Sequence, residues 1–399
     1  MSDDSSGSVT DSFTETTTTS WLSRIGQSIL GVLIGIVLII GSGVFLFWNE
    51  GRAVQTYRSL AEGAGSVVDI DAGRVDPAND GKLVHVSGEV KTTAPLSDTE
   101  FGVSSPALRL VRSVEMYQWK EESSTETHKN LGGSEEKVTT YKYTQEWSDR
   151  RFDSAKFKRP DGHSNPQMRY AYFEATARDA ALGAFRPSEH VLHLLPADDA
   201  LRVEPDAAAK AAARLGLKLQ AVDGRFYAGA DPGSPHIGDL RISYRIARLG
   251  PASVIGRQSG SDFAEFQTHA GDRLLMAKAG IVSAPDMFQA AKDENRILTW
   301  VLRIVGAVVM FIGFALIFRP LVVVADVVPF IGDVLGAGTG LAALVLTLVA
   351  APLVIGIAWF FYRPVIGIAV LLGGLVLGYG IKHVAGGRRM AAVKPAGAS

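Results

Sequence analysis

The hydropathy of this chain alternates between long apolar runs and one long polar stretch. The first apolar run, residues 25–48, carries no charged residue. Residues 297–318 and 340–361 form two further runs, and each is long enough as a helix, at ~1.5 Å per residue, to cross a hydrocarbon core of about 30 Å. A fourth run, residues 365–381, follows the third after only three residues. We therefore predict four transmembrane helices, of which the last two form a tight antiparallel hairpin.

Residues 319–339 interrupt the apolar C-terminal third. The segment is apolar overall, but it contains Asp326, Pro329 and Asp333. An acidic side chain is costly in the bilayer core and is a functional candidate wherever it occurs there. We interpret this segment as an interfacial or re-entrant connector, with both aspartates placed at the interface.

The polar stretch, residues 49–296, has the alternation of a β-rich region. Residues 107–119 and 138–147 are rich in β-branched and aromatic side chains and predict one long hairpin with a mobile polar tip. Further strands are predicted at 82–90, 191–195, 225–228, 239–247, 263–267 and 273–281. Helices are predicted at 205–215, at 285–298 and in part of 168–185. The expected fold class is a membrane protein with four transmembrane α-helices plus a large β-dominated α+β extracytoplasmic domain between the first and second helices.

Charge at the two ends of the chain predicts its orientation. Residues 382–399 contain four basic and no acidic residues, which places this tail in the cytoplasm by the positive-inside rule. Four spans then put residues 1–24, a Ser/Thr-rich segment expected to be a disordered tail, on the same side. Residues 49–296 are accordingly expected in the periplasm of a bacterium, with the chain in the inner membrane. In a eukaryote they are expected in the lumen of the endoplasmic reticulum or inner nuclear membrane.

Composition excludes several kinds of functional site but does not predict a particular activity. The formal net charge is -1, and no extended basic patch predicts nucleic-acid binding. The absence of cysteine excludes disulfides and thiolate sites. His190 and His193 lie on the predicted strand at 191–195 or beside it, where they would point to opposite faces, so no metal site is predicted from them. Four aspartates crowd residues 69–80, but their spacing does not fit an EF-hand loop. We predict no cofactor, metal or catalytic residue.

Several segments, in order and spacing, resemble one known family. The segments are NEGRAVQTYRSLAEG at 49–63, NDGKLVHVSG at 79–88, LRLVRSVEMYQW at 108–119, YKYTQEW at 141–147, HSNP at 163–166, GDLRISY at 238–244, the pair at 271–272 and FYRP at 361–364. Together they resemble the transmembrane protein 43 (LUMA) family over most of the chain. The Ala/Gly/Arg-rich composition suggests a bacterial-type member.

The resemblance implies a four-span protein with one large domain between the first two spans. It also implies self-association and, in eukaryotes, binding of lamins and emerin-type proteins. Because a bacterium has no lamina, those partners do not transfer to a bacterial member. The expected partners are membrane lipids, the protein itself and unidentified proteins, and no enzymatic activity defines the family.

Twelve residues are singled out as interaction, structural or packing candidates. The polar candidates are Asn49, Glu50, Arg52, His163, Asn165, Asp326, Asp333 and Arg363, and the helix-packing candidates are Gly31, Gly35, Gly374 and Gly378. The small-xxx-small spacing of each glycine pair allows close approach of helices. For His163 and Asn165 the ordinary alternative is a loop held by side-chain to backbone hydrogen bonds.

Three functional hypotheses remain open. The first is a membrane scaffold or organiser that self-associates and presents its extracytoplasmic domain to protein partners. The second is a lipid-binding or transport-related protein that uses the helix bundle and residues 321–339 of the connector. The third is an enzyme with an unrecognised extracytoplasmic site, which would require several of His85, Glu115, His163 and Asp239 to converge.

Overall fold

The computed structural model describes residues 11–365, together with Ile368 and Leu372, and divides into two units. The described residues of the first, called the polar unit, fall within 1–18, 59–128 and 135–291. Those of the second, called the helix unit, fall within 19–58, 129–134 and 292–399. The basic tail and most of the predicted fourth span, with Gly374 and Gly378, lie outside the described residues.

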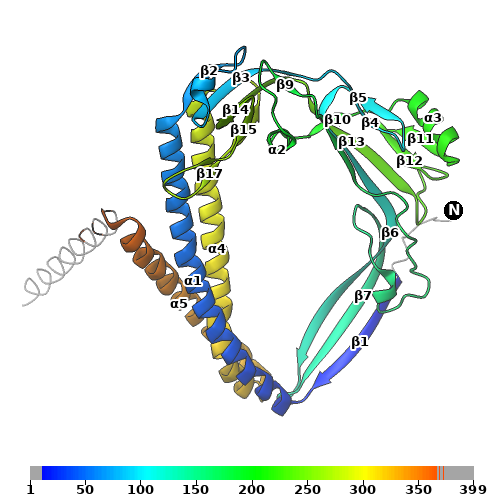
Figure 1. Ribbon diagram of the computed structural model, residues 1–399. Coiled ribbons are helices and arrows are strands. Elements are labelled where there is room, and N and C mark those ends of the chain that lie inside the picture. The colour runs from blue at the N-terminus through cyan, green and yellow to red at the C-terminus, as the bar shows by residue number, and fades with distance from the viewer. Residues whose placement is uncertain (1–10, 366–367, 369–371, 373–399) are drawn as a thin grey trace, which may run out of the picture. The chain divides into compact units, whose positions relative to one another are not determined.

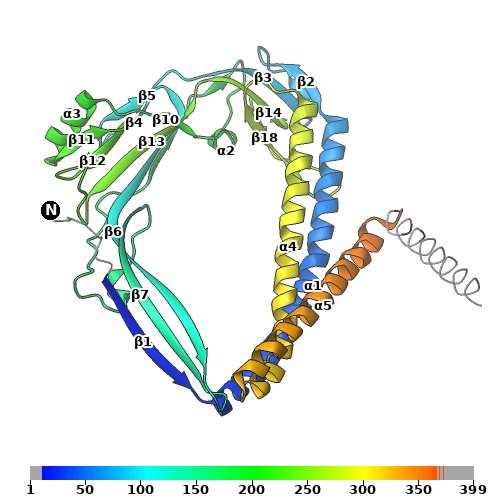
Figure 2. The same cartoon turned by 180° about the vertical axis from the view of Figure 1, so that it is seen from behind.

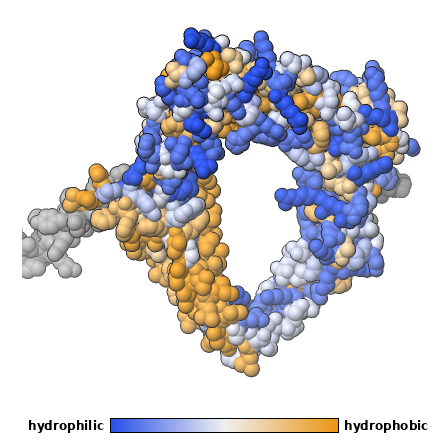
Figure 3. Space-filling model, viewed as in Figure 1, coloured by the Kyte–Doolittle hydropathy of each residue, from blue (hydrophilic) through white to orange (hydrophobic). Residues whose placement is uncertain are grey.

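Three long helices carry the apolar runs. They are α1 (Trp21–Ser66), α4 (Ala284–Ala325) and α5 (Pro329–Tyr362). Within the described residues these three helices are long and apolar enough to cross a membrane. Apolar side chains cover much of their outer surface, which is the orange region of Figure 3. The structure thus contains helices at three of the four predicted spans, and each helix extends beyond the apolar run that predicted it.

The segment predicted as a connector, residues 319–339, is mostly helical. The helix α4 continues past Pro320 to Ala325, and α5 begins at Pro329 after a short turn. Proline is favourable in the first turn of a helix, where its missing N–H has no intrahelical partner. Pro329 therefore begins a helix, which corrects its predicted role as an interruption.

The helices α1 and α4 run side by side in both views (Figures 1 and 2). At their closest approach Gly35 faces Gly313, and a Cβ on Gly35 would lie 2.6 Å from the Gly313 carbonyl oxygen. Gly31 lies one turn earlier, near Leu316. The predicted Gly31/Gly35 face is therefore occupied inside one chain, and it is not free to pack a second copy.

The larger sheet of the polar unit has eight strands. Its path runs β1-β7-β6-β13-β12-β11, with β10 on β13 and β8 on β6. The bounds are β1 Asp11–Thr19, β6 Ala107–Lys129, β7 Glu135–Ser148, β8 Phe173–Thr176, β10 Asp199–Leu201, β11 Leu219–Val222, β12 Arg225–Ala228 and β13 Leu240–Arg248. The helix α3 (Pro205–Leu215), predicted with these bounds, contributes Ala208 and Ala211 to the core of this sheet.

The β6–β7 hairpin is longer than its sequence predicted. The polar segment between the two predicted strands was expected to be a mobile tip, but strand structure continues to Lys129 and resumes at Glu135. Threonine has high β-propensity, and Thr125 and Thr139 pair their hydroxyls across the strands at 3.0 Å. Only residues 130–134 form the turn.

The N-terminal residues also differ from the disordered tail expected at 1–24. Asp11–Thr19 forms β1, an edge strand paired with β7, and α1 begins at Trp21. Phe13 stacks on Tyr141 with ring centroids 6.2 Å apart, and Lys158 binds Glu15 at 2.6 Å. The segment Asp11–Thr19 is polar, but it contains a run of threonines and one aromatic residue. Both residue types have high β-propensity, which favours its pairing with the sheet.

The smaller sheet has six strands and the path β15-β14-β3-β2, with β18 on β14 and β9 on β3. The bounds are β2 Val68–Asp71, β3 Leu83–Lys91, β9 Ala181–Leu182, β14 Gly250–Ser259, β15 Asp262–Ala264 and β18 Met276–Ala279. Two small hairpins, β4 Leu96–Asp98 with β5 Val103–Ser105 and β16 Phe266–Gln267 with β17 Arg273–Leu274, complete the described strands. Two 3-10 turns occupy Pro77–Asn79 and Ser154–Lys156.

Two secondary-structure predictions in this region are wrong. Residues 191–195 were expected to be a strand, but α2 (Glu189–His193) is a short helix. Val191, Leu192 and Leu195 are buried, which is the i, i+1, i+4 spacing of a helix face. Residues 168–185 were expected to be partly helical and instead contain only β8 and β9 with loops.

The close α1–α4 contact gives a first prediction. Gly35→Ala would push a methyl group into the Gly313 carbonyl, and we expect it to destabilise the helix unit by about 1–3 kcal/mol through overpacking. Thermal unfolding in detergent should show a lowered Tm. Gly41→Ala is the matched control, because its Cβ meets nothing within 4 Å. Equal Tm values for the two variants would contradict the contact.

Candidate functional site: buried charge clusters of the helix unit

A carboxylate buried among three apolar helices forms the first cluster. Glu50 is only 1% exposed. It accepts two hydrogen bonds from Arg303, at 2.6 Å from Nε and 2.8 Å from Nη2, and a third at 2.8 Å from Trp359 Nε1. These three residues, called the Glu50 cluster, come from α1, α4 and α5. The bidentate geometry satisfies both carboxylate oxygens, which is what a buried ion pair requires.

Next to it, polar side chains join α1 to α4. Asn49 donates to the Thr299 carbonyl at 3.1 Å. Arg52 donates to the side chains of Asn295 and Thr299, each at 3.1 Å, and Asn295 donates back to the Ala53 carbonyl. The predicted candidates Asn49, Glu50 and Arg52 thus all face neighbouring helices, where they fix the register of α1 against α4.

The end of α5 meets the same part of α1. Phe47 packs on the ring of Tyr362 with centroids 5.2 Å apart, and Arg58 donates to the Tyr362 carbonyl at 2.9 Å. The backbone N–H of Arg363 closes the last turn of α5 on Trp359. Two family-like segments far apart in sequence, 49–63 and 361–364, are therefore in direct contact in the structure.

The second cluster lies at the other end of the same helices. Asp326 is fully buried. Arg24 Nη2 and Lys129 Nζ bind its two oxygens at 2.5 Å and 2.8 Å, and Lys129 also binds Asp333 at 2.8 Å. These four residues, called the Asp326 cluster, contain two positive and two negative charges. The pairing offsets the large cost of burying the Asp326 carboxylate in apolar surroundings.

The β6–β7 turn is built into this cluster. Arg24 also donates to the Gly133 carbonyl at 2.7 Å, and the Gly132 N–H donates to the Val327 carbonyl at 3.1 Å. A Cβ at Gly332 would overlap the Asp326 carboxylate, so that position requires glycine. Residues 129–134 are consequently part of the helix unit, although by sequence they belong to the polar stretch.

These contacts bear on the predicted placement of the N-terminal tail. The prediction put residues 1–24 and 49–296 on opposite sides of the membrane. In the structure β1 is hydrogen-bonded to β7, and Arg24 shares Asp326 with Lys129. Residues that precede the first apolar run therefore lie beside residues of the polar stretch that follow it, both in the polar unit and in the helix unit.

The other predicted polar candidates stabilise loops of the polar unit. Asn165 accepts from the Trp119 N–H at 2.7 Å and donates to the Trp119 carbonyl at 2.8 Å, so its amide pairs with β6 as a strand residue would. His163 donates from Nδ1 to the Arg159 carbonyl at 3.0 Å, and its ring stacks on that of Tyr143 with centroids 3.9 Å apart. Both residues hold the loop after β7 against the hairpin.

The four residues of which the enzyme hypothesis requires several to converge have different partners. On the smaller sheet His85 binds Asp69 and the Val282 carbonyl. In the turn before β13 Asp239 accepts a hydrogen bond from Tyr227 at 2.6 Å, and on β6 Glu115 lies 4.0 Å from Arg225. Burial raises the pKa of the Tyr227 hydroxyl, helped by Asp239, which keeps it protonated as the donor of this hydrogen bond.

The possible metal ligands have ordinary partners. Asp71, Asp76 and Asp80 each accept a backbone N–H in a turn. On α2, His193 lies 3.3 Å from Glu174 and 3.4 Å from Glu189. Across residues 11–365, no group of three or more His, Cys, Asp or Glu side chains has the arrangement of a metal site.

The polar unit has a buried ion pair of its own. Arg112 binds Asp98 at 2.7 Å and Glu100 at 2.8 Å, and Tyr244 donates to Asp98 at 2.7 Å. Burial raises the pKa of Tyr244, and the hydrogen bond to Asp98 raises it further. The group joins β4, β6 and β13 beside the main core, which is a structural role.

Sequence reasoning missed four residues of the two clusters, namely Arg24, Lys129, Arg303 and Trp359. Arg303 had a usable signal, because it and Glu50 are opposite charges at matching ends of two apolar runs. Lys129 had no such signal in the sequence, because it is 197 positions from Asp326 and lies in a polar segment. Only the folded chain shows that the β6–β7 turn supplies the countercharge.

The fold and clusters define a multi-helix membrane protein with a large β-rich polar region. The family model described as Transmembrane protein 43 matches residues 116–364. Transmembrane protein 43 of Homo sapiens is 34% identical over 374 residues, and that of Mus musculus is 35% identical over 374 residues, each alignment covering 90% of both chains. The Transmembrane protein 43 homolog of Drosophila melanogaster is 29% identical over 354 residues, covering 86% of this chain and 91% of the homolog. The chain belongs to the transmembrane protein 43 family, and the predicted resemblance is confirmed. No solved structure matches it.

The Glu50 cluster predicts a strong coupling between two charges. Glu50→Ala would leave Arg303 buried without its carboxylate, and we expect a loss of about 3–5 kcal/mol in stability. The exchange Glu50→Arg with Arg303→Glu should recover part of the lost Tm in detergent. Arg296→Ala is the control, because Arg296 forms only an exposed ion pair with Asp293 and should leave Tm nearly unchanged. A Glu50→Ala variant as stable as this control would refute the coupling.

The Asp326 cluster and β1 predict the sidedness of the N-terminal tail. The chain contains no cysteine, so single cysteines can be introduced without background labelling. In sealed vesicles, Ser12→Cys, Ser23→Cys and Leu131→Cys should react with a membrane-impermeant maleimide from the same side. Leu131 is 85% exposed, and Ser12 and Ser23 are exposed as well, so all three are accessible. Labelling of Leu131→Cys from the side opposite to Ser23→Cys would contradict the shared cluster.

Proposed function

We propose that this protein is a multi-pass membrane scaffold that self-associates and presents its polar region to protein partners. The observation that carries the proposal is the Asp326 cluster. It fastens the β6–β7 turn to α1 and to the α4–α5 turn through paired charges. A scaffold needs turns that are held in place in this way, because a partner binds best to a surface that is already ordered.

The proposed self-association uses an outward face of α5. Exposed apolar residues recur along this helix at intervals of three and four, as in helix-packing seams. The set is Leu346, Val349, Leu353, Ile357 and Phe360, here called the α5 stripe. Helices in lipid associate through van der Waals packing along such continuous surfaces. The Gly31/Gly35 face does not contribute, because α4 already covers it.

For localisation we propose an integral, multi-pass protein, placed in the inner membrane if the source is bacterial. The three apolar helices and the family support membrane insertion. The bacterial placement rests on composition alone. The compartment of the polar region follows from the cysteine labelling rather than from the charge of residues 382–399, which lie outside the described residues.

Self-association is tested by measuring particle mass in lipid nanodiscs. Mass photometry should show discrete oligomers of the wild-type chain at nanomolar concentration. Val349→Trp, on the α5 stripe, should shift the distribution towards the single chain by several-fold, because the larger ring prevents close packing. Val37→Trp is the matched control on the exposed face of α1 and should leave the distribution unchanged. A wild-type chain that is monomeric at every concentration would refute self-association.

A further inference from the structure

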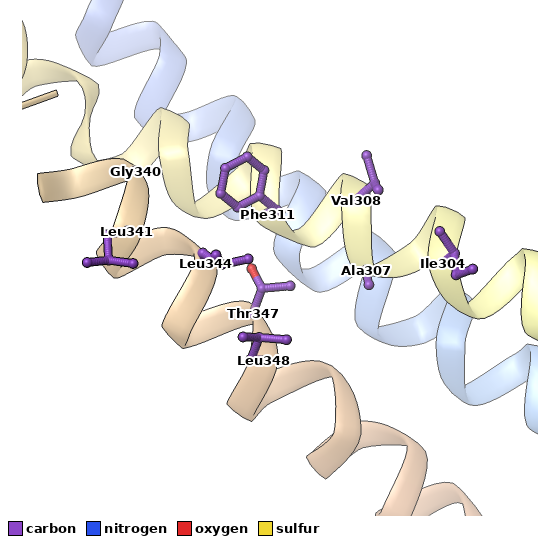
Figure 4. A pocket seen from close by; sticks show the side chains of 9 residues that line it. All are labelled: Ile304, Ala307, Val308, Phe311, Gly340, Leu341, Leu344, Thr347 and Leu348. Carbon is purple, nitrogen blue, oxygen red and sulfur yellow. The ribbon is translucent and has the colours of Figure 1, made fainter. Parts of the chain in front are cut away.

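A groove runs between α4 and α5 inside the helix unit. Its volume is about 570 Å³. From α4 it is lined by Ile304, Val308 and Phe311, and from α5 by Leu344, Thr347 and Leu348, as the close view shows (Figure 4). The volume is in the range of about 300–1,000 Å³ that ligand pockets have. The groove belongs to neither charge cluster, so its occupant has to be inferred from its lining.

The lining offers nothing to a polar ligand. Thr347 is the one lining residue with a polar side chain, and its hydroxyl donates to the Ala343 carbonyl of its own helix at 2.8 Å. All the other lining side chains are hydrocarbon. Water enters a cavity only where two or more polar partners receive it, and purely apolar cavities take apolar ligands instead. The lining therefore suits a hydrocarbon ligand.

The groove extends along α4 from Ile304 to Phe311. Seven residue steps of helix at 1.5 Å each cover about 11 Å, which is roughly a third of the 30 Å hydrocarbon core. Trp300 lies one turn before Ile304 on the same face of α4, is 58% exposed and follows the polar turn that contains Arg296, as tryptophans do at membrane interfaces. The groove thus begins about one turn from the interface and extends towards the bilayer midplane.

The cross-section of the groove excludes a helix. Its volume spread over the lined length of about 11 Å gives a mean cross-section of about 50 Å², whereas a helix 10 Å wide occupies about 80 Å². A second copy therefore does not fit its α5 stripe or any other helix into this space. An extended hydrocarbon chain is narrow enough to enter.

We propose that this groove holds one acyl chain of a bilayer lipid, taken from the leaflet whose interface contains Trp300. The chain lies between α4 and α5 with its end at Phe311, and its ester region is level with Trp300. The Arg303 guanidinium lies over the Trp300 ring at 4.7 Å and keeps that ring oriented at the mouth. Bulk lipid is equally apolar, so retention comes from close packing on two helices rather than from the hydrophobic effect.

Native mass spectrometry after transfer from nanodiscs to detergent tests the proposal, because detergent removes loosely bound lipid. With palmitoyl-oleoyl phosphatidylcholine as the probe, the wild-type chain should retain one lipid per chain. Val308→Trp would fill the groove with an indole ring and should reduce the retained fraction at least five-fold. Leu344→Trp, from the opposite wall, should do the same. Val37→Trp, which faces outward from α1, should retain lipid as the wild type does.

The same preparation identifies the occupant. A photo-crosslinking benzoylphenylalanine that replaces Trp300, which is exposed at the mouth and does not line the groove, should give an adduct with the mass of the retained lipid. Crosslinking to a peptide of a second chain, or to residues 365–381 of the same chain, would overturn the proposal. Loss of lipid from the Val37→Trp control, retention in both groove variants at unchanged Tm, or a wild-type chain without lipid would also overturn it. The proposal does not depend on self-association, because occupancy is counted per chain in any oligomer.

Discussion

The fully buried carboxylate of Asp326 is the constraint on which the helix unit depends. An isolated charge among apolar helices would cost many kcal/mol, so the fold has to bring positive charge to it. It does so from two distant parts of the chain, Arg24 at the start of α1 and Lys129 at the end of β6. Satisfying one carboxylate therefore closes α1, the α4–α5 turn and the β6–β7 turn into one structure. The Glu50 cluster repeats the principle at the other end of the helices, with Arg303 as the countercharge.

The parts of the fold that are encoded locally could be predicted. Long apolar runs gave three helices, the Pro205–Leu215 segment gave α3 with its bounds, and the turn-flanked run at Arg225–Ala228 gave β12. The wrong predictions concern segments whose secondary structure depends on tertiary contacts. The composition of Asp11–Thr19 predicts disorder, but this segment forms a strand because it pairs with β7 at the edge of the sheet. Pro329 predicts the end of a helix by its residue type, but it starts α5, because proline is tolerated in the first turn of a helix.

The candidate site was predictable to a similar, limited extent. Asn49, Glu50, Arg52 and Asp326 were recognisable because polar residues within or beside apolar runs are expensive and therefore have a reason to be there. Their partners were not recognisable, because Lys129 and Trp359 are unremarkable in sequence and become important only through contacts across 197 and 309 positions. The predicted orientation stays a prediction. The charge rule counts residues along the chain and takes no account of contacts such as the pairing of β1 with β7.

The two proposed uses of α5 are compatible because they involve different faces. Leu344 and Leu348 line the groove, whereas Val349 and Leu353 point out along the α5 stripe. Successive residues of a helix are rotated by about 100° around its axis, so the groove-lining residues and the α5 stripe lie on different faces of α5. An acyl chain packed against the groove-lining face of α5 would fix the angle between α5 and α4. It would thereby fix the direction in which the α5 stripe faces. A scaffold assembled through the α5 stripe would then respond to which lipid fills the groove, since the packing surface moves with the helix that carries it.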